Sequence, residues 1–318
     1  MKTFMKTFPQ ISALSLSLCA ALALSACGGG DGDDTQPASH GWRVEEGQPV
    51  TLRFAARAGS APVACGGEVV VNGVPVEPAD MRFYISGVRL LRADGSSVPL
   101  QLSGNNRWQY AAGENSVNLI DLRQPAGACA LTSQNHPELS GTAPAGEYVG
   151  VEMVLGVPLA VNHLDAADDV NTPEVLRSSV HPAMSWNWRG GRKFTNIELR
   201  PTDGSAVSTL LHLGSTGCNA DPAKGDYPIT DCGAPNRVPL RFASFNPTQQ
   251  QIVLDVQALF DGQDMHAENR CMSAARDESC IAPFSALALD FHAEDGSGNG
   301  RPVEGVTQRA LRVEQVAQ

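Results

Sequence analysis

The sequence predicts an all-β fold, an immunoglobulin-like or related β-sandwich with long disulfide-braced loops and little helix. Short β-rich runs recur, clusters of Gly, Asn and Asp separate them, and helical periodicity is weak throughout. In one run, Ile252, Leu254 and Val256 fall on a single face, as expected of a half-buried strand. The segments predicted as strands are 50–55, 81–91, 116–122, 147–155, 238–245, 251–260 and 284–291.

The N-terminus has the pattern of a lipoprotein signal peptide over residues 1–26. Two lysines precede an apolar run over 11–24, too short for a lone membrane span, and the cleavage box Leu-Ser-Ala-Cys ends at Cys27. Cys27 is therefore the expected lipidation site. Because Gly28 follows it in place of Asp, we expect an outer-membrane anchor facing the periplasm or the cell surface. Residues 27–45 are expected to form a flexible tether.

The remaining residues, 46–318, are predicted to form one elaborated domain, with a division near 200–206 as the alternative. A short helix is expected over 172–178. Asn171 offers a cap there, and Pro173 suits the first helical turn.

Cysteine usage predicts a disulfide framework. Of eight cysteines, one leaves with the signal peptide and Cys27 is lipidated, so six remain in an exported chain. Six cysteines allow several connectivities, and the sequence alone does not choose among them. Pairing of chain neighbours predicts Cys65–Cys129, Cys218–Cys232 and Cys271–Cys280. The alternative, a cysteine-rich metal site, lacks any Cys-x-x-Cys spacing.

The charge of the chain argues against nucleic-acid binding. The net charge is −11 for the full chain, and about −13 once the two signal-peptide lysines are removed. Such a chain is repelled by anionic phosphates. It also contains no phosphate-binding loop, no Gly-x-Ser-x-Gly and no His-Glu-x-x-His, so nucleotide-dependent and hydrolytic enzymes are not indicated.

Two segments place tryptophans beside soft or borderline metal ligands. Residues 181–194 read His-Pro-Ala-Met-Ser-Trp-Asn-Trp-Arg-Gly-Gly-Arg-Lys-Phe, and residues 212–218 read His-Leu-Gly-Ser-Thr-Gly-Cys. On a strand, Trp186 and Trp188 share a face, and Met184 falls on it too. The two adjacent glycines then lead toward a second strand. This pattern predicts a hairpin with tryptophans on one side, where His163, His181 and His212 converge.

With Asn162-His163 and the pair Cys271 and Cys280, these motifs resemble the MbnP family, also called metallo-mystery-pair four-Cys-motif proteins. The resemblance spans most of residues 50–295. It implies a periplasmic or lipid-anchored copper-binding protein encoded beside a di-haem peroxidase of the MbnH type. It also implies that this partner oxidises a Trp to kynurenine, which then takes part in copper binding. Arg192 stands where the family has an aromatic residue, which affects local packing more than the metal site.

The resemblance assigns one copper, expected as Cu(I), to His163, His212 and an oxidised Trp. Considered alone, the two histidines read as a loop residue and a solvent-facing strand residue, and the tryptophans read as sheet-packing residues. An indole has no metal-ligating lone pair, whereas kynurenine carries an aromatic amine and a ketone. Trp188 is slightly favoured over Trp186 as the modified residue. His181 and Met184 are further candidates, although Met184 also suits core filling.

We expect a monomer that scavenges, stores or passes copper and is not itself a catalyst. A different class of function is a surface lipoprotein that binds glycan or protein through exposed aromatic residues, namely Trp42, Trp108 and Tyr110. A copper-dependent oxidase with an open coordination position is a third possibility.

Overall fold

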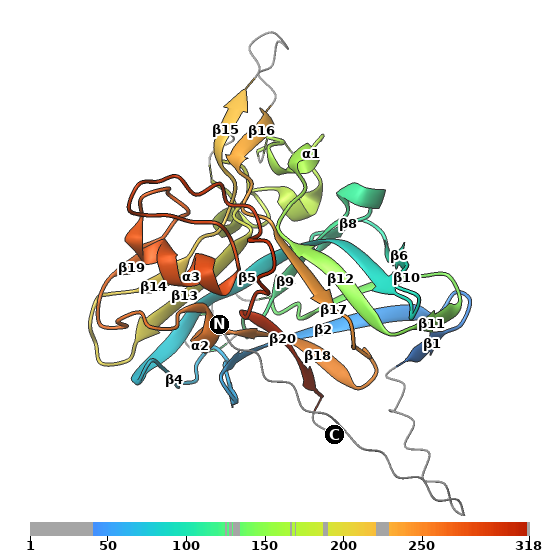
Figure 1. Ribbon diagram of the computed structural model, residues 1–318, viewed down its shortest axis with the longest axis horizontal. Coiled ribbons are helices and arrows are strands. Elements are labelled where there is room, and N and C mark those ends of the chain that lie inside the picture. The colour runs from blue at the N-terminus through green and yellow to red at the C-terminus, as the bar shows by residue number, and fades with distance from the viewer. Residues whose placement is uncertain are drawn as a thin grey trace, which may run out of the picture. The chain divides into compact units, whose positions relative to one another are not determined.

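The computed structural model describes residues 41–316, except 125, 127–128, 130–133, 166, 169, 187–189 and 221–228. These residues belong to one compact unit that is built mostly of strands (Figure 1). The predicted signal peptide and Cys27 lie outside them. Within the described part of the chain, no helix is both long and apolar enough to cross a membrane.

The first large sheet has six strands and contains one parallel pairing, between β18 and β2. Strand β2 alternates buried and more exposed residues along most of its length, as a half-buried strand does. The strands in spatial order are β20 (Leu311–Gln315), β18 (Gln250–Asp255), β2 (Pro49–Ala58), β10 (Glu138–Thr142) and β7 (Gln101–Leu102), with β3 (Ala61–Pro62) beside β2.

The second large sheet has ten strands and is built around the 18-residue strand β5 (Val74–Leu91). Its main path is β17 (Val238–Phe242), β12 (Gly150–Leu155), β5, β13 (Thr195–Pro201), β14 (Thr209–Leu211) and β19 (Asn269–Cys271). Strands that pair outside this path are β4 (Val69–Val71), β6 (Ser97–Pro99), β8 (Gln109–Tyr110) and β9 (Val117–Asp121).

Two small sheets and a few short helices complete the unit. The small sheets pair β1 (Trp42–Val44) with β11 (Gly146–Tyr148), and β15 (Thr216–Ala220) with β16 (Ile229–Ala234). The α-helices are α1 (Leu159–Asn162), α2 (Val256–Leu259) and α3 (Ile281–Ala286), and single 3₁₀ turns are η1 (Gly113–Asn115), η3 (Glu174–Leu176), η4 (Pro182–Met184) and η6 (Glu278–Cys280).

One apolar core joins the two large sheets. Leu52 and Phe54 of β2 and Phe83 and Ile85 of β5 belong to the same buried cluster. The rings of Phe54 and Phe83 meet edge to face with centroids 5.8 Å apart. This packing confirms the predicted all-β fold with little helix, while its immunoglobulin-like detail stays a prediction.

Four of the predicted strand segments differ from the structure. Segment 147–155 is divided between β11 and β12, and the strand in segment 238–245 ends at Phe242. Strand β18 stops at Asp255, because the Asp255 side chain accepts hydrogen bonds from the Gln257 and Ala258 backbone N–H groups and caps α2. The predicted strand over 284–291 does not form, because α3 covers its start and Leu289 makes only an isolated bridge to Pro302. Buried positions 280, 283, 284 and 287 follow the helical spacing, which the alternation of small and large residues obscured.

Other expected boundaries also shift. The predicted helix over 172–178 is only the single turn η3. The end of the predicted tether packs on the domain, because Trp42 is 8% exposed and donates from Nε1 to the Phe245 carbonyl at 2.9 Å. The tether prediction therefore applies to residues before β1.

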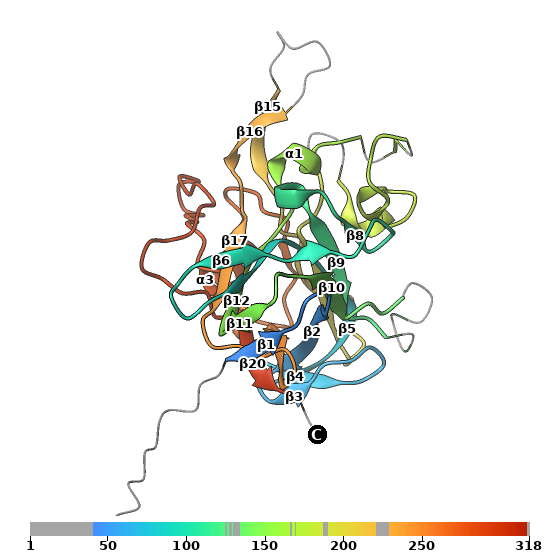
Figure 2. The same ribbon diagram turned by 90° about the vertical axis from the view of Figure 1, so that its right-hand side faces the viewer.

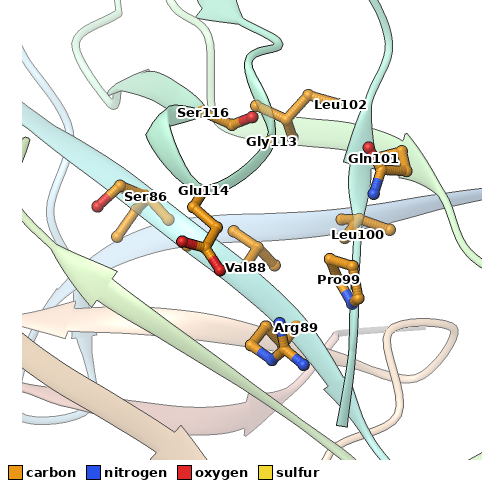
Figure 3. Close-up of a pocket in the computed structure, with 12 residues that line it drawn as sticks. Ser86, Val88, Arg89, Pro99, Leu100, Gln101, Leu102, Gly113, Glu114 and Ser116 are labelled. Atoms are coloured by element: carbon orange, nitrogen blue, oxygen red, sulfur yellow. The ribbon is translucent and has the colours of Figure 1, made fainter. Parts of the chain in front are cut away.

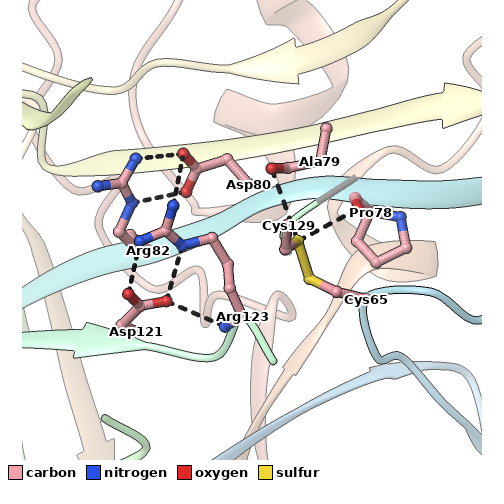
Figure 4. The surroundings of a disulfide bond; sticks show 8 residues. All are labelled: Cys65, Pro78, Ala79, Asp80, Arg82, Asp121, Arg123 and Cys129. Carbon is pink, nitrogen blue, oxygen red and sulfur yellow. Dashed lines mark hydrogen bonds and ion pairs between the residues drawn. A yellow bond between two sulfur atoms is a disulfide. The ribbon is translucent and has the colours of Figure 1, made fainter. Parts of the chain in front are cut away.

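All three predicted disulfides are present, namely Cys65–Cys129, Cys218–Cys232 and Cys271–Cys280. A buried network of charged side chains lies beside the first (Figure 4). Arg82 donates to Asp80, and Arg123 donates to Asp121 from Nε at 2.9 Å and from Nη2 at 2.6 Å. These four side chains are at most 9% exposed. Each buried charge in the network has a partner, as burial requires.

Candidate metal centre

His163 directly follows α1, and its ring is oriented by Asn162. The Asn162 Oδ1 atom accepts from the Arg192 backbone N–H at 2.9 Å, and its Nδ2 lies 3.0 Å from His163 Nε2. Since that amide nitrogen donates, His163 Nε2 is the accepting nitrogen and the imidazole is neutral. A neutral imidazole is the form that binds a metal, and a metal bound at Nε2 would take the place of the Asn162 amide.

Gly191 is required beside Asn162. Its φ is +70°, and a Cβ there would lie 2.8 Å from Asn162 Oδ1. Any larger residue would displace the amide that orients His163.

Arg192 clamps the chain on both sides of His163. Its guanidinium donates to the Asn162 carbonyl at 2.7 Å, to the Leu164 carbonyl, and twice to the Leu176 carbonyl at 3.0 and 2.8 Å. The residue is 1% exposed, and this burial lowers its pKa from the ordinary value. Arg192 therefore replaces the aromatic residue of the resembling family with a hydrogen-bonded clamp.

Trp186 lies on a short hairpin that Arg192 closes. Ser185 bridges to Arg192, and the Trp186 backbone N–H donates to the Gly191 carbonyl at 3.0 Å. The six-membered part of the indole rests on Gly214, where a Cβ would come within 2.5 Å of Cζ3. The indole Nε1 is buried and has no hydrogen-bond partner. Trp188 lies outside the described residues.

His212 follows β14 and is held by a carboxylate. Its Nε2 lies 3.0 Å from Glu198 Oε1, and this hydrogen bond holds the pKa of Glu198 below its ordinary value. The residue is 6% exposed, and its Nδ1 is buried without a partner. Donation from Nε2 to the carboxylate leaves the lone pair on Nδ1. A carboxylate on one ring nitrogen and a free lone pair on the other is the usual arrangement of a metal-binding histidine.

Contacts join the three segments that carry these residues. The Asn162 amide packs on Gly191 and Arg192, and the Trp186 ring packs on Gly214, two residues after His212. No hydrogen bond joins the rings of His163 and His212. Among the described residues, the group with three donor atoms within 4.8 Å of one another consists of His163, Cys218 and Cys232.

His181 lies beside Trp108 and the backbone of Arg107. Its Nε2 lies 2.6 Å from the Arg107 carbonyl, and its ring packs against Trp108 with centroids 5.4 Å apart. Burial lowers the pKa of His181 to about 4. These contacts fit packing beside Trp108, and His181 as a metal ligand stays a prediction.

Met184 does not lie on a strand. It ends η4, a 3₁₀ turn with Pro182 at its start, and is fully buried in the core. The expected strand fails here because proline fixes the turn. Core filling, the alternative reading of Met184, fits these contacts better.

The aromatic residues expected on an exposed binding face are not exposed together. Trp42 is buried against Tyr148, with ring centroids 5.5 Å apart. Trp108 is half-buried and stacks on His136 at 4.6 Å. Trp42 is therefore not available to an aromatic binding surface, whereas Trp108 and Tyr110 are partly exposed.

A separate cavity of about 230 Å³ lies between β5, the segment 99–102 and the segment 113–116 (Figure 3). Its wall includes Val88, Leu100 and Leu102, and the Glu114 carboxylate points into it. None of the predicted metal ligands lines this cavity.

Three features of the centre were not predicted from the sequence. Glu198 pairs directly with Leu210, so His212 is its diagonal neighbour on the adjacent strand. That relation becomes visible only once the strand register is known. The Arg192 clamp and the contact of His163 with Cys232 join distant segments, and no local pattern signals them.

Comparison with known proteins gives a consistent result. The family model MbnP matches residues 47–273. The solved structure of MbnP from Methylosinus trichosporium is similar with a TM-score of 0.72 and 32% sequence identity, over 85% of this chain and 99% of that chain. No curated protein matches.

Proposed function

Because the chain belongs to the MbnP family, we propose that it is an exported copper-binding protein, lipid-anchored at Cys27. It takes up and holds copper, and it stores the metal or passes it on. The anchor places it in the outer membrane, facing the periplasm or the cell surface.

The observation that carries this proposal is the His212 ring. Its Nδ1 lone pair is buried without a partner, while Glu198 holds the opposite nitrogen at 3.0 Å. An unpartnered buried acceptor costs about 1–3 kcal/mol. A bound cation would remove that cost, and imidazole suits copper. His163, oriented by Asn162, supplies the second nitrogen.

The third ligand comes from an oxidised tryptophan, Trp186 or Trp188. A di-haem peroxidase of the MbnH type is the partner that oxidises it. Opening the pyrrole ring converts the indole nitrogen into an aromatic amine. In Trp186 that nitrogen is Nε1, which is buried without a partner. Modification therefore turns an unsatisfied donor into a possible ligand for Cu(I).

The test is expression of the full chain with and without the peroxidase. Copper is measured by elemental analysis, and the peptide over 182–192 is examined by mass spectrometry. We expect kynurenine and bound copper only after co-expression. Unaltered indoles at both Trp186 and Trp188 after co-expression would refute the modification.

A double variant tests the ligands. His163→Ala with His212→Ala should abolish copper uptake, because both imidazoles are lost. The matched control is His266→Ala with His292→Ala, whose side chains are 57% and 51% exposed. Equal copper in both double variants would overturn the assignment of the site.

A further inference from the structure

The three disulfides differ in how accessible they are. Cys129, Cys271 and Cys280 are fully buried, and Cys65 is 5% exposed. In the third bridge Cys232 is 9% exposed but Cys218 is half-buried, on a hairpin that projects beyond the large sheets beside α1 (Figures 1 and 2). Thiol–disulfide exchange requires that a thiolate reach a sulfur atom. Cys218–Cys232 is therefore the bridge that an external thiol reaches first.

The strands around this bridge hold its two sulfurs together by themselves. Cys218 and Cys232 are direct partners in the antiparallel pair β15–β16, with Cα atoms 3.8 Å apart. Opening the bridge leaves the backbone pairing in place, so the two thiols stay side by side.

His163 completes a donor set with these sulfurs. Its Nε2 lies 3.5 Å from Cys232 Sγ, and all three donor atoms lie within 4.8 Å of one another. In a tetrahedral site with metal–sulfur bonds of about 2.3 Å and a metal–nitrogen bond of about 2.0–2.1 Å, sulfur and nitrogen are about 3.6 Å apart. The observed spacing already matches that geometry.

We propose that reduction of Cys218–Cys232 creates a second metal site, formed by Cys218, Cys232 and His163. Two thiolates and a neutral imidazole favour a soft or borderline d¹⁰ cation, Cu(I) or Zn²⁺. The reductant is a dithiol. It forms its own disulfide while two electrons and two protons pass to Cys218 and Cys232. Binding of the cation then releases those two protons.

This site shares His163 with the copper site proposed above. If the proposed function is right, His163 belongs to both sites. The redox state of Cys218–Cys232 then decides whether His163 binds metal together with His212 or together with the two thiolates. The thiolate site itself does not depend on kynurenine or on His212.

The first experiment reduces the intact chain with limiting dithiothreitol and labels free thiols by alkylation, with mass spectrometry to locate them. We expect label at Cys218 and Cys232 before the other four structural cysteines. Earlier labelling of Cys65, Cys129, Cys271 or Cys280 would overturn the proposal.

The second experiment titrates the selectively reduced chain with Cd²⁺ and follows thiolate-to-metal charge-transfer absorption. We expect one cation per reduced chain and none per oxidised chain. His163→Ala should weaken binding by at least about 10-fold, the lower end of the loss caused by removing even an outer-shell partner. His292→Ala is the matched control. Equal affinity in the two variants, or no binding by the reduced chain, would refute the site.

A variant avoids reduction altogether, in case reduction unfolds the chain. Cys218→Ala frees the Cys232 thiol beside His163 without any reductant, and should bind Cd²⁺ more weakly than the reduced chain. Adding His163→Ala should weaken this binding again, and an unchanged affinity contradicts the proposal. If the reduced chain binds Cd²⁺ but the chain never binds copper, the proposed function fails and the thiolate site stands. If copper binds but the reduced chain does not bind Cd²⁺, the thiolate site fails and the proposed function stands.

Discussion

The charged network of Asp80, Arg82, Asp121 and Arg123 is buried, and so are the ring nitrogens Trp186 Nε1 and His212 Nδ1 of the candidate centre. The two regions satisfy these buried polar atoms differently. In the network every carboxylate and guanidinium has a partner. In the centre two ring nitrogens, Trp186 Nε1 and His212 Nδ1, have none.

We interpret the charged network as part of the structural scaffold and the centre around Trp186 and His212 as a binding site. Buried charges stabilise a fold only when partners meet them, so a paired network fixes strands β5 and β9 together. Unpartnered buried nitrogens instead lower stability, and are expected where a ligand or a modification later satisfies them. The four charged side chains and the two ring nitrogens differ in this respect, but Asn196, which donates to Asp80, also has a buried Oδ1 without a partner.

The largest expected effect is on the scaffold. Arg123→Met should lower the free energy of unfolding by about 3–5 kcal/mol, because it leaves the buried Asp121 carboxylate without its guanidinium. The control Arg43→Met removes an ion pair whose side chains are 68% and 69% exposed, and should cost at most about 1 kcal/mol. Chemical denaturation measures both, and similar losses would remove the contrast between buried and exposed pairs.

The disulfides also differ in how much they are expected to stabilise the fold. Replacing Cys65 and Cys129 by Ala opens a link between residues 64 apart, and should cost about 4 kcal/mol by the loop-entropy relation. Replacing Cys218 and Cys232 by Ala opens a link between residues 14 apart, and should cost about 3 kcal/mol. Thermal unfolding of both variants should therefore rank the hairpin bridge as the weaker one. The reverse ranking would place Cys218–Cys232 in the scaffold.

Much of this architecture was predictable, for identifiable reasons. Alternation along β2 reflects a single buried face, and cysteine pairing followed chain order. The helix α3 was missed because its run of small and large residues also fits a strand. The roles of Glu198 and Arg192 could not be predicted. Glu198 is a diagonal neighbour of His212, which depends on strand register, and the Arg192 guanidinium contacts carbonyls that only tertiary packing brings together. Residue type alone identified Trp186 and His212 as candidates. That their ring nitrogens have no hydrogen-bond partner could not be predicted from the sequence.

His181 interacts electrostatically with Arg82 and Asp121 of the network, and its pKa predicts how stability depends on pH. Burial lowers its pKa to about 4 from 6.5, so between these values the unfolded chain binds a proton that the folded chain does not. Stability is therefore lost as the pH falls through this window. Arg82, Arg107 and Asp121 contribute smaller effects.

His181→Gln removes that titration while keeping a donor for the Arg107 carbonyl. Between pH 7 and pH 4.5 it should lose about 2–3 kcal/mol less than the unaltered chain. Denaturation at both pH values measures this. Copper uptake should not change, and its loss would return His181 to the metal site.

The smallest effect is expected from the tryptophan of the centre. Trp186→Phe removes a donor that has no partner, so its cost should be only about 0–1 kcal/mol, since the lost ring contacts are partly offset. The matched variant Trp42→Phe breaks the 2.9 Å hydrogen bond to the Phe245 carbonyl and should cost about 2 kcal/mol. Denaturation of the pair decides between the two roles. If Trp186→Phe is the more destabilising variant, the indole is part of the scaffold, and its unpartnered nitrogen no longer points to modification.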